Sequence, residues 1–101
     1  LKIVRWAQQI CDGPAIVFTF NLSQYFNHYT DDEIYDLFYN DPMHQGVPET
    51  PLPKYVLVDT ENLNTQWRGR KPQKNFLWLQ NEFTMRKEAT KENYTLYSIA
   101  P

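Results

Sequence analysis

Four basic side chains lie within seven residues in the second half of the chain: Arg68, Arg70, Lys71 and Lys74. Gly69 and Pro72 interrupt them, so we expect a flexible loop whose cations can contact phosphate groups. Residues 1–66 hold three basic and nine acidic residues, whereas residues 67–101 hold seven basic and three acidic residues. The net charges of −6 and +4 place the positive charge around this loop. The alternative is an ordinary solvated loop with no ligand.

Two apolar stretches carry aromatic residues that could stack on a planar ligand. The stretches are AIVFTF at 15–20 and FLWLQNEF at 76–83. Their β-branched and aromatic composition predicts two strands, and alternation places Phe18 and Phe20 on one face of the first, and Phe76 and Trp78 on one face of the second. An aromatic ring on an open sheet face stacks on a nucleobase for about 1–3 kcal/mol per base. The alternative is that a second layer, such as an N-terminal helix, covers these rings.

Other site chemistries lack the residues they need. His28 and His44 are sixteen residues apart and Cys11 is the only cysteine, so no zinc spacing can be built. The three glycines are isolated, which excludes a glycine-rich phosphate loop. We therefore expect no metal, no cofactor and no catalysis by this chain alone.

Helices are predicted at two places in the first half of the chain. Residues 2–11 repeat apolar side chains at helical spacing, and Gly13 and Pro14 end the segment. Thr30 and Glu33 have the spacing of a capping box, which predicts a helix that runs from residue 30 to residue 40. A long proline-rich loop, 41–54, follows this helix.

Further strands are predicted at 55–59 and 94–100, and 84–92 reads as a short helix or the tip of a hairpin. The order β-α-β-β-(α)-β behind the N-terminal helix predicts one α+β domain over residues 1–101. We expect a two-layer sandwich with a ferredoxin-like sheet, helices on one face and the other face free.

Two segments resemble the signatures of the RNA-recognition motif. Residues 17–22 (VFTFNL) are similar to its first-strand signature, and residues 74–81 (KNFLWLQN) resemble its third-strand signature. The resemblance covers residues 15–100. It implies that Phe18, Phe76 and Trp78 stack on bases, that Lys74 contacts a phosphate, and that the alternate aliphatic residues face the helices.

The composition predicts the class of protein and its compartment. Hydrophobic residues make up 42% of the 101 residues, and the longest apolar run is too short to span a membrane. A single cysteine indicates a reducing, intracellular compartment, in the cytoplasm or nucleus. The triplets at Asn21 and Asn93 keep an extracellular location open. The chain begins with Leu1, so a leader is absent or removed, and a longer parent chain stays open.

These patterns predict a non-catalytic module that binds single-stranded RNA through an aromatic sheet face and a basic loop. The predicted contact residues are Phe18, Phe20, Phe76, Trp78, Arg68, Arg70, Lys71 and Lys74. The alternative is a protein-interaction or assembly domain, with a protein partner or a second copy of the chain, in which a helix or partner covers the sheet face.

Overall fold

The computed structural model describes residues 2–11 and 13–100 of the chain. Its elements run in this order: α1 (Lys2–Ile10), β1 (Ile16–Thr19), α2 (Ser23–Tyr29), β2 (Glu33–Asp36), α3 (Pro42–Gln45), β3 (Lys54–Asp59), α4 (Thr60–Asn64), α5 (Lys71–Glu82), β4 (Thr84–Lys91) and β5 (Tyr94–Ala100). The predicted α+β class is confirmed.

The five strands form one mixed open sheet in the order β2-β1-β3-β5-β4. β1 pairs in parallel with both β2 and β3, and Phe18 lies opposite Tyr35 on one side and Val56 on the other. β5 runs antiparallel to both β3 and β4. This strand order differs from the predicted ferredoxin-like order, so that finer prediction is not confirmed.

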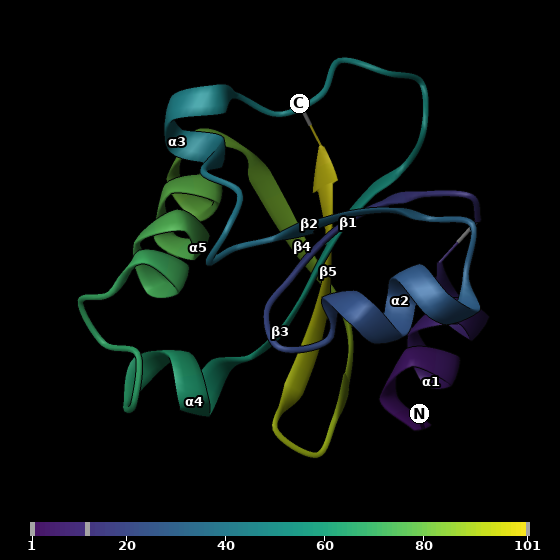
Figure 1. The fold of residues 1–101 in the computed structure, drawn as a ribbon, viewed down its shortest axis with the longest axis horizontal. Coiled ribbons are helices and arrows are strands. Elements are labelled where there is room, and N and C mark those ends of the chain that lie inside the picture. The colour runs from purple at the N-terminus through teal and green to yellow at the C-terminus, as the bar shows by residue number, and fades with distance from the viewer. Residues whose placement is uncertain (1, 12, 101) are drawn as a thin grey trace.

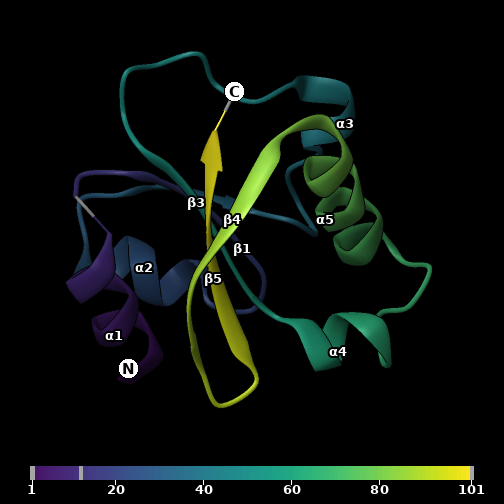
Figure 2. The ribbon, with the colours of Figure 1, turned by 180° about the vertical axis from the view of Figure 1, so that it is seen from behind.

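Helices cover both faces of the sheet (Figures 1 and 2). On one face, Ala7 of α1 and Phe26 of α2 join the core that contains Val17 and Leu57. On the other face, Leu63 of α4 and the α5 residues Phe76 and Leu79 pack in the core that contains Phe18 and Val56. The prediction of one free sheet face is therefore wrong.

Residues 76–83 are not a strand, because most of them belong to α5. Pro72 lies in the first turn of this helix, where its missing N–H costs no hydrogen bond. The buried residues of α5 are Pro72, Asn75, Phe76 and Leu79. Their spacing of three, one and three is the repeat of one helical face. The alternation of aromatic and aliphatic residues in Phe-Leu-Trp-Leu is typical of a strand, and it led to the wrong prediction. Phe76 and Trp78 lie on a helix.

The predicted helix from residue 30 to residue 40 is a strand and a turn instead. Thr30 Oγ1 accepts a hydrogen bond from the backbone N–H of Asp32 at 3.2 Å, and the backbone N–H of Glu33 donates to the carbonyl of Ala15 at 2.9 Å. Asp32, which is buried, accepts from the backbone N–H of Ala15 at 2.9 Å. These long-range bonds draw the segment into the sheet as β2.

Two further elements differ from the predictions. α2 supplies the crossover between β1 and β2 and was not predicted. Residues 84–92 are mostly the strand β4, which forms a hairpin with β5, and Glu92 adopts a left-handed φ of 56° at its turn. The helix at 2–11 and the strands at 15–20, 55–59 and 94–100 are confirmed to within one residue at each end. The predicted proline-rich loop 41–54 is confirmed only in part, because α3 lies within it and leaves 46–53 without a helix or strand.

We expect Asn75→Leu to lower the free energy of unfolding by about 1–3 kcal/mol. The buried Asn75 amide donates to the carbonyl of Leu37 at 2.8 Å and to that of Asn40 at 3.3 Å, and leucine leaves both carbonyls without this donor. Urea denaturation measures the change. Asn81→Leu, at an exposed position of α5, is the matched control and should change stability little. Equal stability of the two variants would contradict a structural role for this amide.

Candidate nucleic-acid interface

The four aromatic residues predicted to stack do not share an open surface. Phe18 is 1% exposed and stacks on Tyr35 at a centroid distance of 5.3 Å. Phe20 and Phe76 are also buried, at 8% and 5% exposure, and only Trp78 is partly accessible. The predicted outward orientation is wrong for Phe18, Phe20 and Phe76. Phe18 and Phe20 are buried because α5 and its neighbours cover this face of the sheet, and Phe76 is one of the α5 residues that pack on it.

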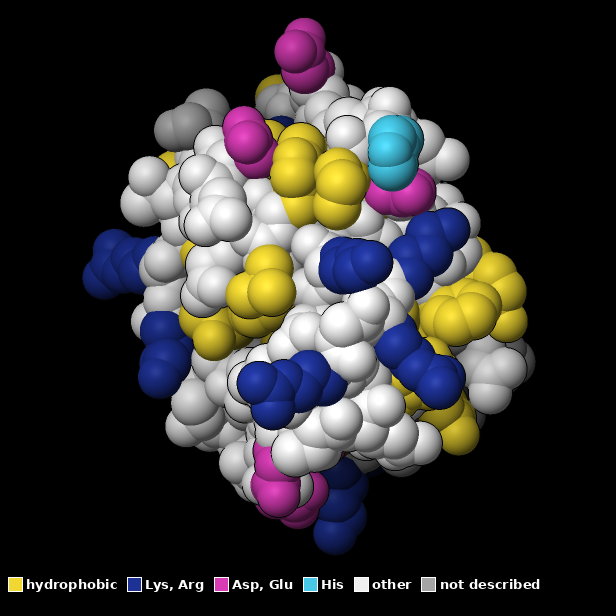
Figure 3. All heavy atoms as spheres, turned by 90° about the vertical axis from the view of Figure 1, so that its left-hand side faces the viewer, with side chains coloured by type: hydrophobic (Ala, Val, Ile, Leu, Met, Phe, Trp, Pro, Cys, Tyr) yellow, Lys and Arg dark blue, Asp and Glu magenta, His cyan; other side chains and the backbone are white. Residues whose placement is uncertain are grey.

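The four predicted cations have exposed side chains and lie in and just before the beginning of α5. The predicted flexible loop is confirmed only in part, because Arg68 lies in the turn before α5 whereas Lys71 and Lys74 are helical. Arg70 is the N-cap residue of α5, and Lys71 and Lys74 follow in its first turns. Figure 3 shows Lys and Arg side chains gathered on this side of the molecule, beside hydrophobic side chains. Within residues 2–11 and 13–100, the ion pairs are His44–Asp41 and Arg86–Glu88. None of the four cations forms an ion pair within that part of the chain.

A group of aromatic side chains that the sequence analysis missed lies next to these cations. Trp67 makes edge contacts with Phe20 at 4.9 Å and with Phe38 at 5.9 Å, and Phe38 contacts Tyr39 at 5.0 Å. Phe38 is 39% exposed and Tyr39 is 78% exposed. The Arg70 guanidinium lies 5.5 Å above the Trp67 ring, within the range of a cation–π contact.

We call this region the aromatic–basic surface. Its members are Phe38, Tyr39, Trp67, Arg68, Arg70, Lys71 and Lys74. Three of them are aromatic and four are cationic, which is the combination that contacts both the bases and the phosphates of a nucleic acid.

Hydrogen bonds fix the turn that carries Phe38 and Tyr39. Asp36 accepts from the backbone N–H of Phe38 at 2.8 Å, and Asn40 Oδ1 accepts from the backbone N–H of Asp36 at 2.9 Å. The Asn75 amide of α5 binds the carbonyls on both sides of the two aromatics. The aromatic turn and the basic beginning of α5 are therefore held together as one unit.

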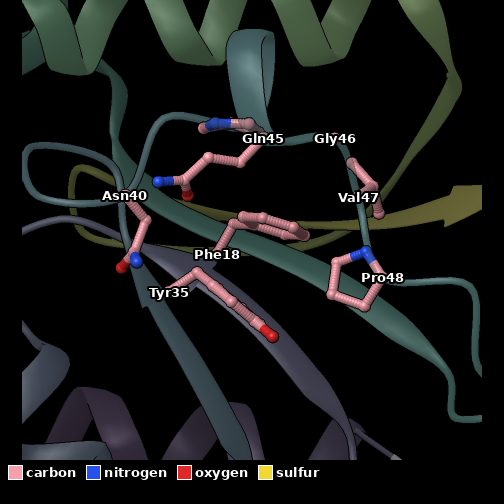
Figure 4. Close-up of a pocket in the computed structure, with 8 residues that line it drawn as sticks. Phe18, Tyr35, Asn40, Gln45, Gly46, Val47 and Pro48 are labelled. Carbon is pink, nitrogen blue, oxygen red and sulfur yellow. The ribbon is translucent and has the colours of Figure 1, made fainter.

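Two pockets lie on the far side of this turn and share the segment Gly46–Pro48. The smaller, about 210 Å³, lies between the Phe18 and Tyr35 rings and residues 45–48 (Figure 4). The larger, about 590 Å³, is lined by Trp78 together with Phe83, Ile99 and Lys54. Two of the predicted contact residues, Phe18 and Trp78, therefore line neighbouring pockets.

Local contacts shift the pKa of two groups near the smaller pocket. Burial raises the pKa of Tyr35 above its usual value, and the hydrogen bond that its hydroxyl donates to Glu33 at 2.9 Å raises it further. The hydrogen bond with His44, 2.8 Å away, lowers the pKa of Asp41, and Lys71 adds a smaller effect in the same direction. Lys71 is therefore electrostatically coupled to the residue that precedes α3.

Metal-binding side chains do not assemble in the described part of the chain. Among its side chains, no three His, Cys, Asp or Glu residues are placed to hold a metal ion. The side chain of His28 lies outside the described residues. No helix within 2–11 and 13–100 is long and apolar enough to cross a membrane.

Comparison with family models, curated proteins and solved structures finds no match for this chain.

We expect Asp41→Asn to weaken the fall in stability on the acid side of the pH profile. The folded-state pKa of Asp41 is lower than its ordinary value of 3.8, so its carboxylate stabilises the fold above that value and loses this effect as the pH falls below it. Thermal unfolding followed at several pH values between about 2 and 6 measures the slope. Asp31→Asn, at an exposed position, is the control. A wild-type slope in Asp41→Asn would contradict the role of this pair.

Proposed function

We propose that this protein is a non-catalytic module that binds single-stranded RNA through the aromatic–basic surface. One observation carries the proposal: the Arg70 guanidinium lies over the Trp67 ring while Phe38 and Tyr39 are exposed beside it. An aromatic face stacks on any unpaired base, and an arginine plane over an aromatic ring adds a second planar contact. The ligand and the basic residues are the ones predicted from the sequence. The stacking residues are Phe38, Tyr39 and Trp67 in place of the aromatics predicted on the sheet face.

Charge supports a phosphate-bearing ligand for this surface. Residues 66–81 contain four basic and no acidic residues, although the chain has a net charge of −2. A local cationic surface on an acidic protein restricts phosphate binding to that surface, because the remaining surface repels the backbone. Exposed rings favour single strands, since the bases of a duplex are stacked on one another and are not free to pack against a side chain.

A protein partner is the second candidate, and the apolar part of the same side of the molecule favours it. Met43 is 39% exposed and Leu77 is 42% exposed, in addition to Phe38 and Tyr39. Aromatic residues, methionine and arginine are enriched at protein interfaces. The two candidates differ in their need for phosphate, so the salt dependence of binding separates them.

Tyr39→Ala should weaken binding of a short mixed-sequence RNA by about 5- to 150-fold, the loss of one base stack. Tyr39 is 78% exposed, so its removal should leave the fold intact. Tyr25→Ala is the matched control, because Tyr25 is also exposed but lies on α2, on the opposite face of the sheet. Fluorescence anisotropy of a labelled oligomer measures both affinities. No RNA binding by the wild type, together with concentration-dependent self-association in sedimentation velocity, would favour the second candidate.

Replacing Arg68, Lys71 and Lys74 together by glutamine should flatten the salt dependence of RNA binding. Each neutralised phosphate of a single strand contributes about −0.7 to the slope of log K against log salt, so three lost contacts reduce its magnitude by about 2. The same anisotropy titration at several salt concentrations gives the slope. The control replaces Arg86, Lys87 and Lys91 of the edge strand β4, and should retain the wild-type slope. Equal slopes for the two triple variants would rule out this surface as the phosphate contact.

A further inference from the structure

One threonine lies in the middle of the proline-rich loop that connects α3 to β3. Residues 48–54 read PETPLPK, and Thr50 is the only serine or threonine of the 101 residues that proline follows. The side chains of Thr50 and of its neighbours Glu49 and Pro51 are exposed. In Figure 1 this loop is the teal segment that runs over the top of the molecule. The Thr50 hydroxyl is therefore accessible to a large partner.

The backbone of this loop is bonded only at its two ends. The N–H of Gly46 donates to the carbonyl of Pro42 at 2.9 Å, and the carbonyl of Pro53 accepts from the N–H of Ile16 at 2.9 Å. Between them, residues 47–52 make no backbone–backbone hydrogen bond within 2–11 and 13–100. Proline follows residues 47, 50 and 52, which favours an extended conformation at each of them. An enzyme can therefore draw this segment into its cleft without breaking the sheet or a helix.

The Thr50 hydroxyl is engaged by a single weak contact. Its Oγ1 accepts from the backbone N–H of Leu52 at 3.3 Å. Among the described residues, this hydroxyl donates to no acceptor. Its proton can therefore be removed without the loss of a hydrogen bond of the fold.

We propose that Thr50 is phosphorylated by a proline-directed Ser/Thr kinase and that Lys54 then pairs with the phosphate. Proline has no backbone N–H, so a kinase that needs this donor directly after its acceptor residue rejects Thr-Pro, whereas a proline-directed kinase accepts it. A bond forms between Thr50 Oγ1 and the γ-phosphorus of ATP, and the bond from that phosphorus to the β–γ bridging oxygen breaks. ADP leaves, and the hydroxyl proton passes to the catalytic aspartate of the kinase. This inference does not depend on the proposed function.

Lys54 lies where it can receive the new phosphate. Its Nζ donates to the carbonyl of Thr50 at 3.1 Å and, over a longer distance of 3.5 Å, to that of Leu52. A phosphate carries a charge of about −1.5 to −2 at neutral pH and accepts more strongly from an ammonium group than a neutral carbonyl does. The Lys54 ammonium can therefore exchange these carbonyls for the phosphate oxygens.

The other charged group at this place is the Glu49 carboxylate, which opposes the pairing. Glu49, Thr50 and Lys54 line the same side of the larger pocket. The side chains that line it from α5, from β5 and from the residue between α5 and β4 are Trp78, Ile99 and Phe83, and they carry no charge. Phosphorylation therefore adds a dianion to the rim of this pocket, beside its lysine.

Incubation of the whole chain with a purified proline-directed Ser/Thr kinase and Mg-ATP tests the modification. We expect mass spectrometry to find a phosphate on Thr50, and Pro51→Ala to slow its incorporation by about tenfold or more. Pro53→Ala, at an exposed position of the same loop, is the matched control and should be phosphorylated at the wild-type rate. Two results would overturn the proposal: an unmodified Thr50 in a reaction that modifies a free Thr-Pro peptide, or equal rates for Pro51→Ala and the wild type.

A pH titration of the phosphorylated protein, followed by ³¹P NMR, tests the pairing with Lys54. A cation beside the phosphate favours the dianion, so the second pKa of the phosphate should be lower in the wild type than in Lys54→Gln, by about 0.2–0.7 for an exposed pair. Lys91→Gln, at the turn of the β4–β5 hairpin, is the control and should keep the wild-type pKa. The same phosphate pKa in the wild type and in Lys54→Gln would overturn the pairing.

Discussion

The parallel pairing of β1 with strands on both of its sides is the constraint on which the structure depends. A parallel pair requires a crossover connection, and the chain makes two of them, from β1 to β2 and from β2 back to β3. Helices therefore pack on both faces of the sheet, and β1 is buried along its whole length. Any ring on β1, including Phe18, becomes part of a core. A ligand can reach such a protein only at the ends of its strands, along its helices or beneath its loops.

The chain places its accessible aromatic and basic side chains at these remaining positions. Phe38 and Tyr39 follow the end of β2, and Trp67 lies in the connection between α4 and α5. The single buried amide of Asn75 binds the carbonyls on either side of this aromatic pair, so one residue of α5 determines where the aromatics lie relative to the cations. Packing and the proposed binding are therefore coupled: α5 contributes Phe76 and Leu79 to the core and presents Lys71 and Lys74 to solvent.

The sequence predicted the elements whose patterns depend on neighbouring residues alone. The strands β1 and β3 are rich in β-branched and aromatic residues, the residues of β5 alternate, and α1 has a clear amphipathic repeat. β2 was missed because the Thr30 capping geometry is local, whereas the bonds that override it reach back to Ala15. α5 was missed because an alternating aromatic and aliphatic run fits a strand, and only Pro72 and Asn75 reveal the helical face.

The same distinction explains which part of the candidate site was predictable. The four cations were identified from composition, since charges within seven residues stay near one another in a loop or in a helix. The aromatics depend on which face of which element they occupy. The wrong assignment of α5 and β2 misplaced Phe76, Trp78, Phe38 and Tyr39, whereas Phe18 lies on β1 as predicted and is buried because α5 packs over it. Phe38 and Tyr39 could be placed only once 33–36 was known to be extended and the amide of Asn75 was known to donate to the carbonyls of Leu37 and Asn40, which are 38 and 35 residues away.

The segment from Leu37 to Gly46 physically connects the aromatic–basic surface to the smaller pocket. Its first part carries the exposed rings, and its last part, with α3, forms one wall of the smaller pocket. Asn40 lies at the junction, where its backbone carbonyl accepts from α5 and its side chain lines the pocket. The proposed phosphate contacts come from the beginning of α5, whereas the smaller pocket is lined by the last part of this segment, so the two features use different side chains held by one turn. A ligand that orders this turn would affect both features, whereas a substitution at the tip of a side chain in one of them would affect only that one.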